Sequence, residues 1–345
     1  MAFEEPAFEQ KLIDIAGEAL AGYADSIDYL REIDLDPLDV ISNWRSAHSY
    51  PLNTFQMTLR TRARQVNAQS LVSQRLKRLS AIGDKLDRMP SLKLSEMQDL
   101  GGCRAVLFTV DEVYQLDELY THSGWKHVLD DRDDYIRRPK SSGYRGIHLI
   151  YKHCSSKSEW DGLKIEIQLR SALQHVWATA VETADVFLRQ GLKASRGSAE
   201  WRRFFALMGT ALARRENCRR VPKTPSDEGE LVAEIRQLVA HHAILPKLEA
   251  FGRTLHVIED VSVMKNARHV ILELDMNAPN LRLYGYVAKE SEEAARRYME
   301  LEKRRVPGVD VVLVSVEHAV DLRRAYPNYY LDTTSFVQFV RETIG

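Results

Sequence analysis

Hydrophobic residues recur at helical spacing through the first part of the chain. Between residues 6 and 33, positions such as Ile13, Ala16 and Leu20 lie three or four residues apart, which predicts one amphipathic helix. Prolines at 37 and 51 interrupt the stretch that follows. A second helical run is predicted from about Asn53 to Met89, where arginine and lysine are frequent.

The pattern changes after residue 100. The apolar run CRAVLFTV (103–110) is typical of a buried strand, and GIHLIYKH (146–153) is a second candidate. In LKIEIQLR (163–170), apolar and polar residues alternate strictly, which predicts a strand with one polar face. Helices are predicted next, from about residue 172 to 189 and from 199 to 215.

The segment RRVPKTPSDEGE (219–230) combines two prolines, a glycine and many charges, and it marks a domain boundary. We therefore predict one domain over residues 1–220 and a smaller one over residues 221–345. The smaller domain is expected to contain a helix at 231–248, strands at 269–276 and 281–288, a helix at 291–305 and a strand at 309–316. A last helical region is interrupted by Pro327.

Composition excludes several protein classes. The 345 residues are 44% hydrophobic and 28% charged, with a net charge of −1, so any nucleic-acid surface must be local. Three cysteines stand far apart without a CxxC pair, which argues against a disulfide framework or a cysteine-based zinc site. No apolar run approaches the ~20 residues that span a bilayer. We expect a cytoplasmic protein with no membrane partner.

Two acidic residues are candidates for holding a metal ion. Asp99 stands just before the predicted strand at 103–110, beside two glycines, and Glu166 lies on the polar face of another strand. Two carboxylates from separate strands, together with substrate phosphates, are sufficient to hold Mg²⁺. Either residue alone could equally be a solvated surface acid.

A short loop between these acids has the composition of a nucleotide site. The segment DYIRRPKSSGYRGIH (134–148) supplies cations such as Lys140 for phosphates, the aromatic ring of Tyr144 for a base, and Gly143 for close approach. A solvated basic loop is the alternative. The phosphate loop GxxxxGK[ST] is absent, so a Walker-type NTPase is excluded.

Three blocks together resemble the RelA/SpoT alarmone synthetases. RLKRLSAIGDK carries Arg75, Lys77, Ile82 and Lys85 at the spacing of that family. DLGGCR carries Asp99 and Arg104. The third block, YIRRPKSSGYRGIH, is completed downstream by EIQLRS, which starts at Glu166. The resemblance covers about residues 60 to 190.

The resemblance implies an α+β fold with a nucleotidyltransferase-like mixed sheet flanked by helices. It also implies an ATP-dependent pyrophosphokinase that uses Mg²⁺. By that resemblance Asp99 and Glu166 hold Mg²⁺, Glu166 also activates the acceptor hydroxyl, and Tyr144 stacks on the acceptor base. The remaining residues fall into two sets: the ATP phosphates would be held by Arg75, Lys77, Lys85 and Arg104, and the pocket would be completed by Lys140, His148, Gln168 and Arg170. Glu182 departs from the expected spacing, and its role stays open.

Two acceptors are compatible with this chemistry. One is GTP or GDP, which would give the alarmones (p)ppGpp. The other is the 3′ end of tRNA, which toxic small synthetases use. A basic stretch at 189–223 could bind a phosphate backbone, or it could be a solvated helix face. Its cations are Arg189, Lys193, Arg196, Arg202, Arg203, Arg214, Arg215, Arg219, Arg220 and Lys223.

The order of elements after residue 230 resembles the pseudo-zinc-finger domain of CapRel-like fused toxin–antitoxin proteins. No cysteine follows Cys218, so four zinc ligands of the usual kind are missing. Tyr326 and Tyr329 form a YxxY element, which in that family closes the ATP site until a phage capsid protein binds. Ordinary core aromatics are the alternative reading.

Three hypotheses follow. The first, which we favour, is an autoinhibited, tRNA-modifying pyrophosphokinase that defends against phage. The second is a housekeeping alarmone synthetase with a regulatory tail. The third is a non-catalytic nucleotide sensor, which the intact acids Asp99 and Glu166 disfavour.

Overall fold

The structure, a computed structural model, describes residues 3–122, 124–188, 198–253, 255–258, 264, 266–304, 306–315 and 321–345. The helices are α1 (Gln10–Leu20), α2 (Ala24–Glu32), α3 (Pro37–Ala47), α4 (Ser49–Val66), α5 (Leu79–Arg88), α6 (Val110–Thr121), α7 (Ala172–Leu188), α8 (Ala199–Arg215), α9 (Glu228–His242), α10 (Ile244–Arg253), α12 (Ser291–Lys303), α13 (Leu322–Ala325) and α14 (Thr334–Ile344). The strands are β1 (Leu71–Leu76), β2 (Gly101–Leu107), β3 (Val128–Asp134), β4 (Ile147–Lys152), β5 (Lys164–Ser171), β6 (His256–Ile258), β7 (His269–Asp275), β8 (Asn280–Tyr286) and β9 (Val309–Ser315).

The strands form one mixed sheet in the order β3-β4-β5-β2-β1-β9-β7-β8-β6. Strands β2 and β5 are parallel, with Gly102 opposite Glu166, while β1 and β4 run antiparallel to their neighbours. The sheet continues across the predicted domain boundary, because β1 pairs with β9 at Gln74↔Ser315 and Arg75↔Val314. The predicted α+β fold with a mixed sheet flanked by helices is confirmed.

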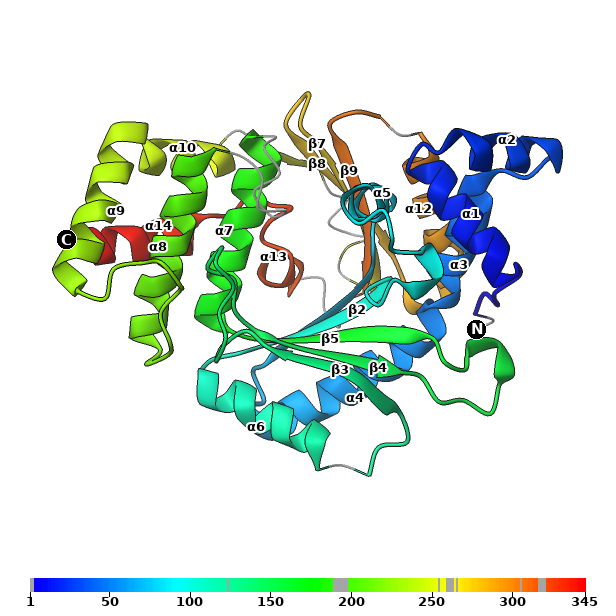
Figure 1. Cartoon of the computed structure of the whole chain (residues 1–345), viewed down its shortest axis with the longest axis horizontal. Helices are drawn as coiled ribbons and strands as arrows, with labels where there is room; N and C mark the ends of the chain where they lie inside the picture. The colour runs from blue at the N-terminus through cyan, green and yellow to red at the C-terminus, as the bar shows by residue number, and fades with distance from the viewer. Residues whose placement is uncertain are drawn as a thin grey trace.

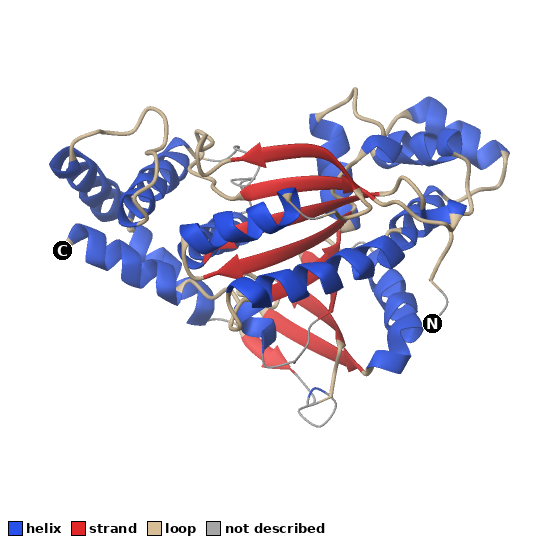
Figure 2. Cartoon of the chain, turned by 90° about the horizontal axis from the view of Figure 1, so that it is seen from below, coloured by secondary structure: helices blue, strands red, loops and turns tan. Residues whose placement is uncertain are grey.

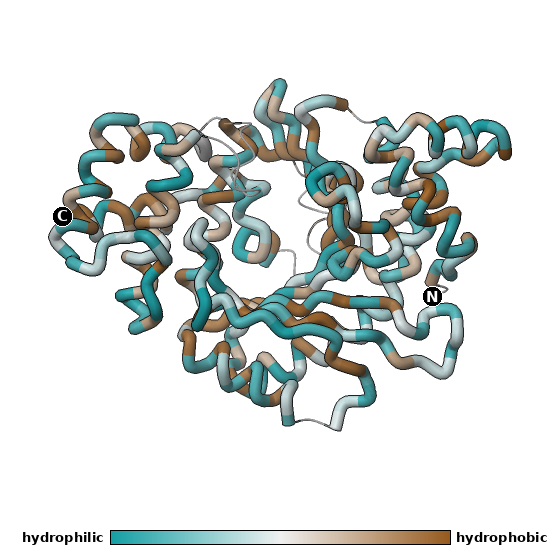
Figure 3. Tube along the Cα trace, viewed as in Figure 1, coloured by the Kyte–Doolittle hydropathy of each residue, from teal (hydrophilic) through white to brown (hydrophobic). Residues whose placement is uncertain are grey.

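One face of the strands β2, β4 and β5 is covered by α4 and α6, which cross the sheet in Figure 2. Alternate strand residues enter this core, among them Cys103, Ile147 and Ile167, and they pack against Phe55 of α4 and Leu116 of α6. Figure 3 shows hydrophobic and hydrophilic positions interspersed along these strands. The intervening polar residues therefore point to the opposite face, where the candidate site lies.

Helical layers flank the sheet at both ends of the molecule (Figure 1). The N-terminal helices α1 and α3 pack with α5 around Ile13, Ile41 and Ile82. On the other side, α7 and α8 share a core with α9, α10 and the C-terminal α14, centred on Phe204 and Phe336. The C-terminal helix is thus built into the core that positions α7.

A buried ion pair ties the N-terminal helices to the C-terminal part. Arg45 of α3 lies 2.5 Å from the Glu302 carboxylate of α12, and both side chains are almost fully buried. The ring of Tyr298 lies beneath the Arg45 guanidinium. Breaking such a pair leaves an uncompensated buried charge, so this contact favours one arrangement of the two parts.

Two long helices predicted from the sequence are wrong in extent. The helix predicted at 6–33 is divided, because Gly22 adopts a φ of 89° and ends α1. The stretch predicted as one helix at 53–89 includes strand β1, which pairs with β2 from Leu71↔Val106 to Leu76↔Gly101. Edge-to-edge pairing with β2 and β9 overrides the helix propensity of this arginine-rich stretch.

The helix predicted at 231–248 is two helices, α9 and α10, separated by Ala243 in a left-handed conformation with φ 49°. The predicted strands correspond to β2, β4, β5, β7, β8 and β9, with described ends that differ by at most three residues. The elements α3, α6, β3 and β6 were not predicted. None of the helices in the described ranges has the length and apolar character that a bilayer span requires.

Candidate active site

The polar face of the sheet forms the floor of a cavity of about 510 Å³. Alternation along the strands aims Glu166, Gln168 and Arg170 of β5 into it, together with His148 of β4. Arg104 of β2, Ser73 and Arg75 of β1, and helix α7 complete the walls. Residues predicted from separate sequence blocks therefore meet in one cavity of ligand-binding size.

Asp99 lies two residues before β2 begins, and its carboxylate bridges the side chains of two lysines. Its Oδ2 accepts from Lys77 Nζ at 2.7 Å, and its Oδ1 accepts from Lys85 Nζ at 2.9 Å. Burial would raise the pKa of Asp99, but the two ammonium groups outweigh burial and hold that pKa below its usual value. Asp99 is therefore an ionised carboxylate in a strongly cationic setting.

Glu166 belongs to a closed circuit of hydrogen bonds. Its Oε1 accepts from His148 Nδ1 at 2.8 Å, and its Oε2 accepts from Gln168 Nε2 at 2.6 Å. The circuit continues from His148 Nε2 to the Tyr144 hydroxyl. Arg170 closes the circuit by donating to that hydroxyl at 3.0 Å and to Gln168 Oε1 at 2.8 Å.

This circuit sets the charge state of its members. Burial opposes the ionised form of Glu166, yet His148 and Gln168 lower the pKa of Glu166 well below its usual range. Burial likewise disfavours the His148 cation, but Tyr144 and Glu166 raise the pKa of His148 to about 9. At neutral pH the circuit holds an anionic carboxylate against a protonated imidazole.

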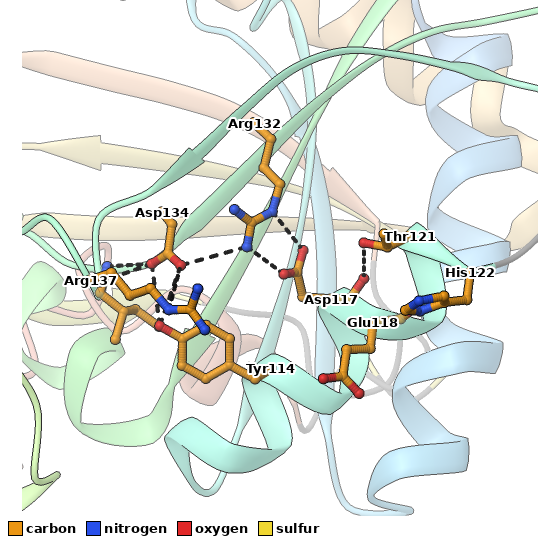
Figure 4. Close-up of polar contacts among 9 residues, drawn as sticks. Tyr114, Asp117, Glu118, Thr121, His122, Arg132, Asp134 and Arg137 are labelled. Atoms are coloured by element: carbon orange, nitrogen blue, oxygen red, sulfur yellow. Dashed lines mark hydrogen bonds and ion pairs between the residues drawn. The ribbon is translucent and has the colours of Figure 1, made fainter.

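A buried aspartate fixes the first turn of the basic loop. Asp134 Oδ1 accepts from the backbone N–H groups of Ile136 at 3.1 Å and Arg137 at 2.9 Å. Figure 4 shows the Tyr114 hydroxyl and the guanidinium groups of Arg132 and Arg137 gathered around its carboxylate. Asp134 thus anchors the loop that carries Lys140 and Tyr144.

Cations cover the aromatic rings of this loop. Lys140 Nζ lies 4.0 Å from the ring centroid of Tyr135 and 5.6 Å from that of Tyr144. The Arg170 guanidinium lies 5.1 Å from the Tyr144 centroid. Tyr135 and Tyr144 meet edge to face at 5.9 Å. An aromatic base stacking on Tyr144 would replace one of these cations at the ring.

The charge balance of the cavity favours a polyphosphate ligand. Seven lysine and arginine residues line it against three carboxylates, those of Asp99, Glu166 and Glu182. Such a surplus of cations would bind successive phosphates. Within the described part of the chain, no group of three or more His, Cys, Asp or Glu residues is placed so that it could hold a metal ion by itself. Asp99 and Glu166 nevertheless fit Mg²⁺, which needs only one or two carboxylates beside substrate phosphates.

Tyr326 reaches the same cavity from the C-terminal segment, and its side chain is buried. Its hydroxyl donates to the backbone oxygen of Gln74 in β1 at 2.7 Å, and its ring lies 5.8 Å from the Arg104 guanidinium carbon. Arg104 itself donates to the Ala325 carbonyl. Tyr329 is not among the residues that line the cavity. Its side chain is buried in the core that residues of β7 and β9 help to form.

The basic residues of α8 make contacts inside the protein. Arg203 forms a two-pronged pair with Glu234 of α9, at 2.6 and 2.8 Å, and it also donates to the Lys223 carbonyl. Arg215 pairs with Glu342 of α14 at 2.6 Å. Arg214 donates to Ser226 and Arg220 to Thr224, in each case to the backbone oxygen. Arg189, Lys193 and Arg196 lie outside the described residues.

Comparison with known proteins agrees with this geometry. Residues 74–187 match the family model for the region found in RelA / SpoT proteins. This part of the chain is similar to the RelA/SpoT region. It extends from β1 through α7 and includes every predicted ligand of ATP, Mg²⁺ and the acceptor.

Among curated relatives, the GTP pyrophosphokinase YjbM of Bacillus subtilis is 32% identical over 111 residues, which are 31% of this chain and 52% of that protein. A GTP pyrophosphokinase of Escherichia coli strain K12 is 26% identical over 166 residues, 48% of this chain and 20% of that protein. The chain thus spans about half or less of these relatives. The crystal structure of small alarmone synthetase 1 from Bacillus subtilis, bound to its product pppGpp, has a TM-score of 0.43 at 21% identity; the match covers 49% of this chain and 89% of that one.

Several residues of the cavity were not singled out from the sequence as site residues. Ser73 and Gln74 belong to the strand that was predicted as helix, Arg88 ends α5, and Trp177 lies on α7. Tyr135 packs against Lys140 and Tyr144 without lining the cavity, and it had a signal, because it stands in the same block as those two residues. Glu182 lines the cavity, although its sequence position alone left its role open.

Proposed function

We propose that this chain is a pyrophosphokinase that transfers the β,γ-diphosphate of ATP to a 3′-hydroxyl. The observation that carries the proposal is the single cavity in which a surplus of lysine and arginine residues surrounds Asp99 and Glu166. The similarity to the RelA/SpoT region supports it. In this reaction the acceptor oxygen bonds to the β-phosphorus, the bond between the β-phosphorus and its bridging oxygen to the α-phosphate breaks, and AMP leaves.

The cavity side chains have two proposed roles: cations that bind the donor phosphates, and carboxylates that bind Mg²⁺. Lys77, Lys85 and Arg75 face the donor phosphates and would neutralise the charge that builds on them. Mg²⁺ held by Asp99 and Glu166 would supply further charge compensation and acidify a bound hydroxyl. His148 and Gln168 lower the pKa of Glu166 against the effect of burial, so the residue is an ionised carboxylate, which is the form that holds Mg²⁺.

The acceptor that we propose is a guanosine nucleotide. Both relatives described above carry the name GTP pyrophosphokinase, and Tyr144 with its loop offers an aromatic face beside cations. Transfer to tRNA is the second candidate from the sequence. Arg203 and Arg215 are paired with carboxylates, and Arg214 donates to a backbone oxygen, so these three cations of the basic stretch have partners within the protein.

We further propose that the C-terminal segment closes the donor side of the cavity at rest. Tyr326 lies beside Arg104 in the cavity wall, and Arg104 donates a hydrogen bond to the Ala325 carbonyl of the same segment. Tyr329 would act only indirectly, by anchoring the segment in the core. A phage capsid protein as the trigger that opens this segment, and a role in phage defence, remain predictions from the sequence alone.

Donor binding and acceptor choice can be tested together with the full chain. ATP labelled on the γ-phosphate is offered with GDP, GTP or deacylated tRNA, for Tyr326→Ala, whose site should be open, and for the same variant with Glu166→Gln added. We expect the label to appear on GDP or GTP, and Glu166→Gln to abolish its transfer while ATP still binds. Labelling of tRNA but not of the nucleotides would reverse the choice of acceptor. Transfer that survives Glu166→Gln would contradict the role of Glu166.

A further inference from the structure

A second cavity of about 450 Å³ lies on the other side of the C-terminal segment. It is bounded by the start of β1, the end of β2, helix α7 and the first turn of α14. Its apolar lining includes Leu71, Val106, Val176 and Phe336, and Phe108 stands half-exposed beside it. The volume is in the range of small-molecule sites.

Two arginines at this cavity form ion pairs that an incoming anion could replace. Arg323 and Arg324 line it, and their side chains are 66% and 64% exposed. Arg323 pairs with Asp332 at 3.0 Å, and Arg324 pairs with Asp321 at 3.6 Å. The partner carboxylates are 24% and 27% exposed, and that of Asp332 also lines the cavity. Because the arginines are well solvated, such pairs contribute little, and an anion that displaces Asp332 could take over both guanidinium groups.

A buried histidine of the same cavity has an unused acceptor. His175 Nε2 lies 3.3 Å from the Arg324 carbonyl, and since a carbonyl only accepts, Nε2 carries the proton. Burial and the neighbouring Arg104 lower the pKa of His175 well below its usual value, so the ring is neutral. Its Nδ1 has no hydrogen-bond partner in the described part of the chain. A ligand with a hydroxyl or N–H group would satisfy this atom.

The wall between the two cavities is a single short segment. Consecutive residues attach it to three different elements: the Arg324 carbonyl to His175 of α7, the Ala325 carbonyl to Arg104 of β2, and the Tyr326 hydroxyl to Gln74 of β1. The side chains of Arg323 and Arg324 line the second cavity, whereas that of Tyr326 lines the first. Whatever binds Arg323 and Arg324 therefore acts on the backbone that places Tyr326.

We propose that the second cavity binds a small amphipathic anion, with an apolar body, a hydroxyl or N–H group for His175 and one carboxylate, sulfonate or phosphate group, and that this ligand holds Tyr326 in the catalytic cavity. The cavity is formed in the closed arrangement, so a ligand that fits it stabilises that arrangement. This inference rests on the proposed closure by Tyr326. By linkage, the ligand and ATP weaken each other's binding although they occupy separate sites.

The test uses 8-anilinonaphthalene-1-sulfonate, a fluorescent anion with an aromatic body, titrated into the full chain. We expect saturable binding of one probe per chain, weakened about tenfold or more in the variant carrying Arg323→Ala and Arg324→Ala, a loss of about 1.4 kcal/mol. Arg31→Ala, which removes a similarly exposed arginine on α2, serves as the matched control and should leave probe binding unchanged. Val176→Trp, which fills the cavity from α7, should weaken binding independently of charge.

The coupling is measured by adding a non-hydrolysable ATP analogue with Mg²⁺. The probe should then bind more weakly to the wild type, and this effect should vanish in Tyr326→Ala. Probe binding that ignores both the arginine pair and Val176→Trp would overturn the site. Competition that persists in Tyr326→Ala would place the probe in the catalytic cavity and refute the coupling. Direct titration of the analogue shows separately whether the proposed ATP site itself fails.

Discussion

Removing one hydroxyl at Tyr326 should make ATP bind more tightly. In Tyr326→Phe the ring keeps its place beside Arg104, and the hydroxyl loses its hydrogen bond to the Gln74 carbonyl and its contact with the Ser73 side chain. Tyr329→Phe is the matched control. Tyr329 is equally buried, but its hydroxyl has no hydrogen-bond partner in the described part of the chain.

The hydrogen bond to the Gln74 carbonyl sets the minimum size of the effect. A neutral hydrogen bond contributes about 0.5–1.5 kcal/mol net, so losing it shifts the closed–open equilibrium by roughly fivefold, taking about 1 kcal/mol as the central value. Where the closed form predominates, the apparent Kd for ATP falls by about the same factor, because affinity scales with the open fraction. Tyr326→Ala also removes the buried ring, at a cost of about 3–5 kcal/mol, and should open the site almost completely.

The assay is a titration of each variant with a fluorescent, non-hydrolysable ATP analogue and Mg²⁺, with thermal unfolding measured alongside to show that both variants fold. We expect tighter binding for Tyr326→Phe and wild-type binding for Tyr329→Phe. Equal affinities for the two variants would show that the Tyr326 hydroxyl does not oppose ATP. Weaker binding by Tyr326→Phe would show that Tyr326 belongs to the ATP site and does not block it.

Three further predictions concern the surroundings of the site. Asp134→Ala should raise the KM for the acceptor several-fold with little change in the KM for ATP, because the loop loses two backbone hydrogen bonds; Asp134→Asn, which can still accept both, should largely restore it. Arg203→Ala should lower the free energy of unfolding by about 1 kcal/mol, and adding Glu234→Ala should cost less than the two single changes summed, as urea denaturation would show. The pKa of Glu166 is lowered in the folded chain. The ionised Glu166 carboxylate therefore stabilises the fold above the unfolded pKa of about 4.3, and this stabilisation is lost as the pH falls below that pKa. In urea unfolding between pH 6 and 3, Glu166→Gln should lose less free energy of unfolding than the wild type.

The catalytic constellation could be predicted because its residues stand in short blocks with fixed spacing. Asp99, Lys140, His148 and Glu166 line one cavity, as those blocks implied. The alternation in 163–170 also predicted which side chains of β5 face away from the core. Local patterns of this kind are sufficient wherever neighbouring residues decide the structure.

Long-range contacts decide what the sequence could not show. Strand β1 owes its conformation to pairing with β2 and with β9, and β9 lies more than two hundred positions further along the chain. The sequence placed Arg203 and Arg215 in a candidate nucleic-acid surface. In the structure they pair with Glu234 and Glu342, which are distant in the sequence. The placement of Tyr326 in the cavity and of Tyr329 outside it likewise depends on how the C-terminal segment packs.

The most direct test of the central claim follows the γ-label of ATP during incubation with GDP and Mg²⁺. For Tyr326→Ala, whose site should be open, we expect the label on the guanosine nucleotide and one AMP released per transfer. Adding Asp99→Asn to this variant should stop both. Release of labelled phosphate with ADP instead of AMP, or no transfer to GDP, GTP or tRNA by the open variant, would contradict the assignment as a pyrophosphokinase.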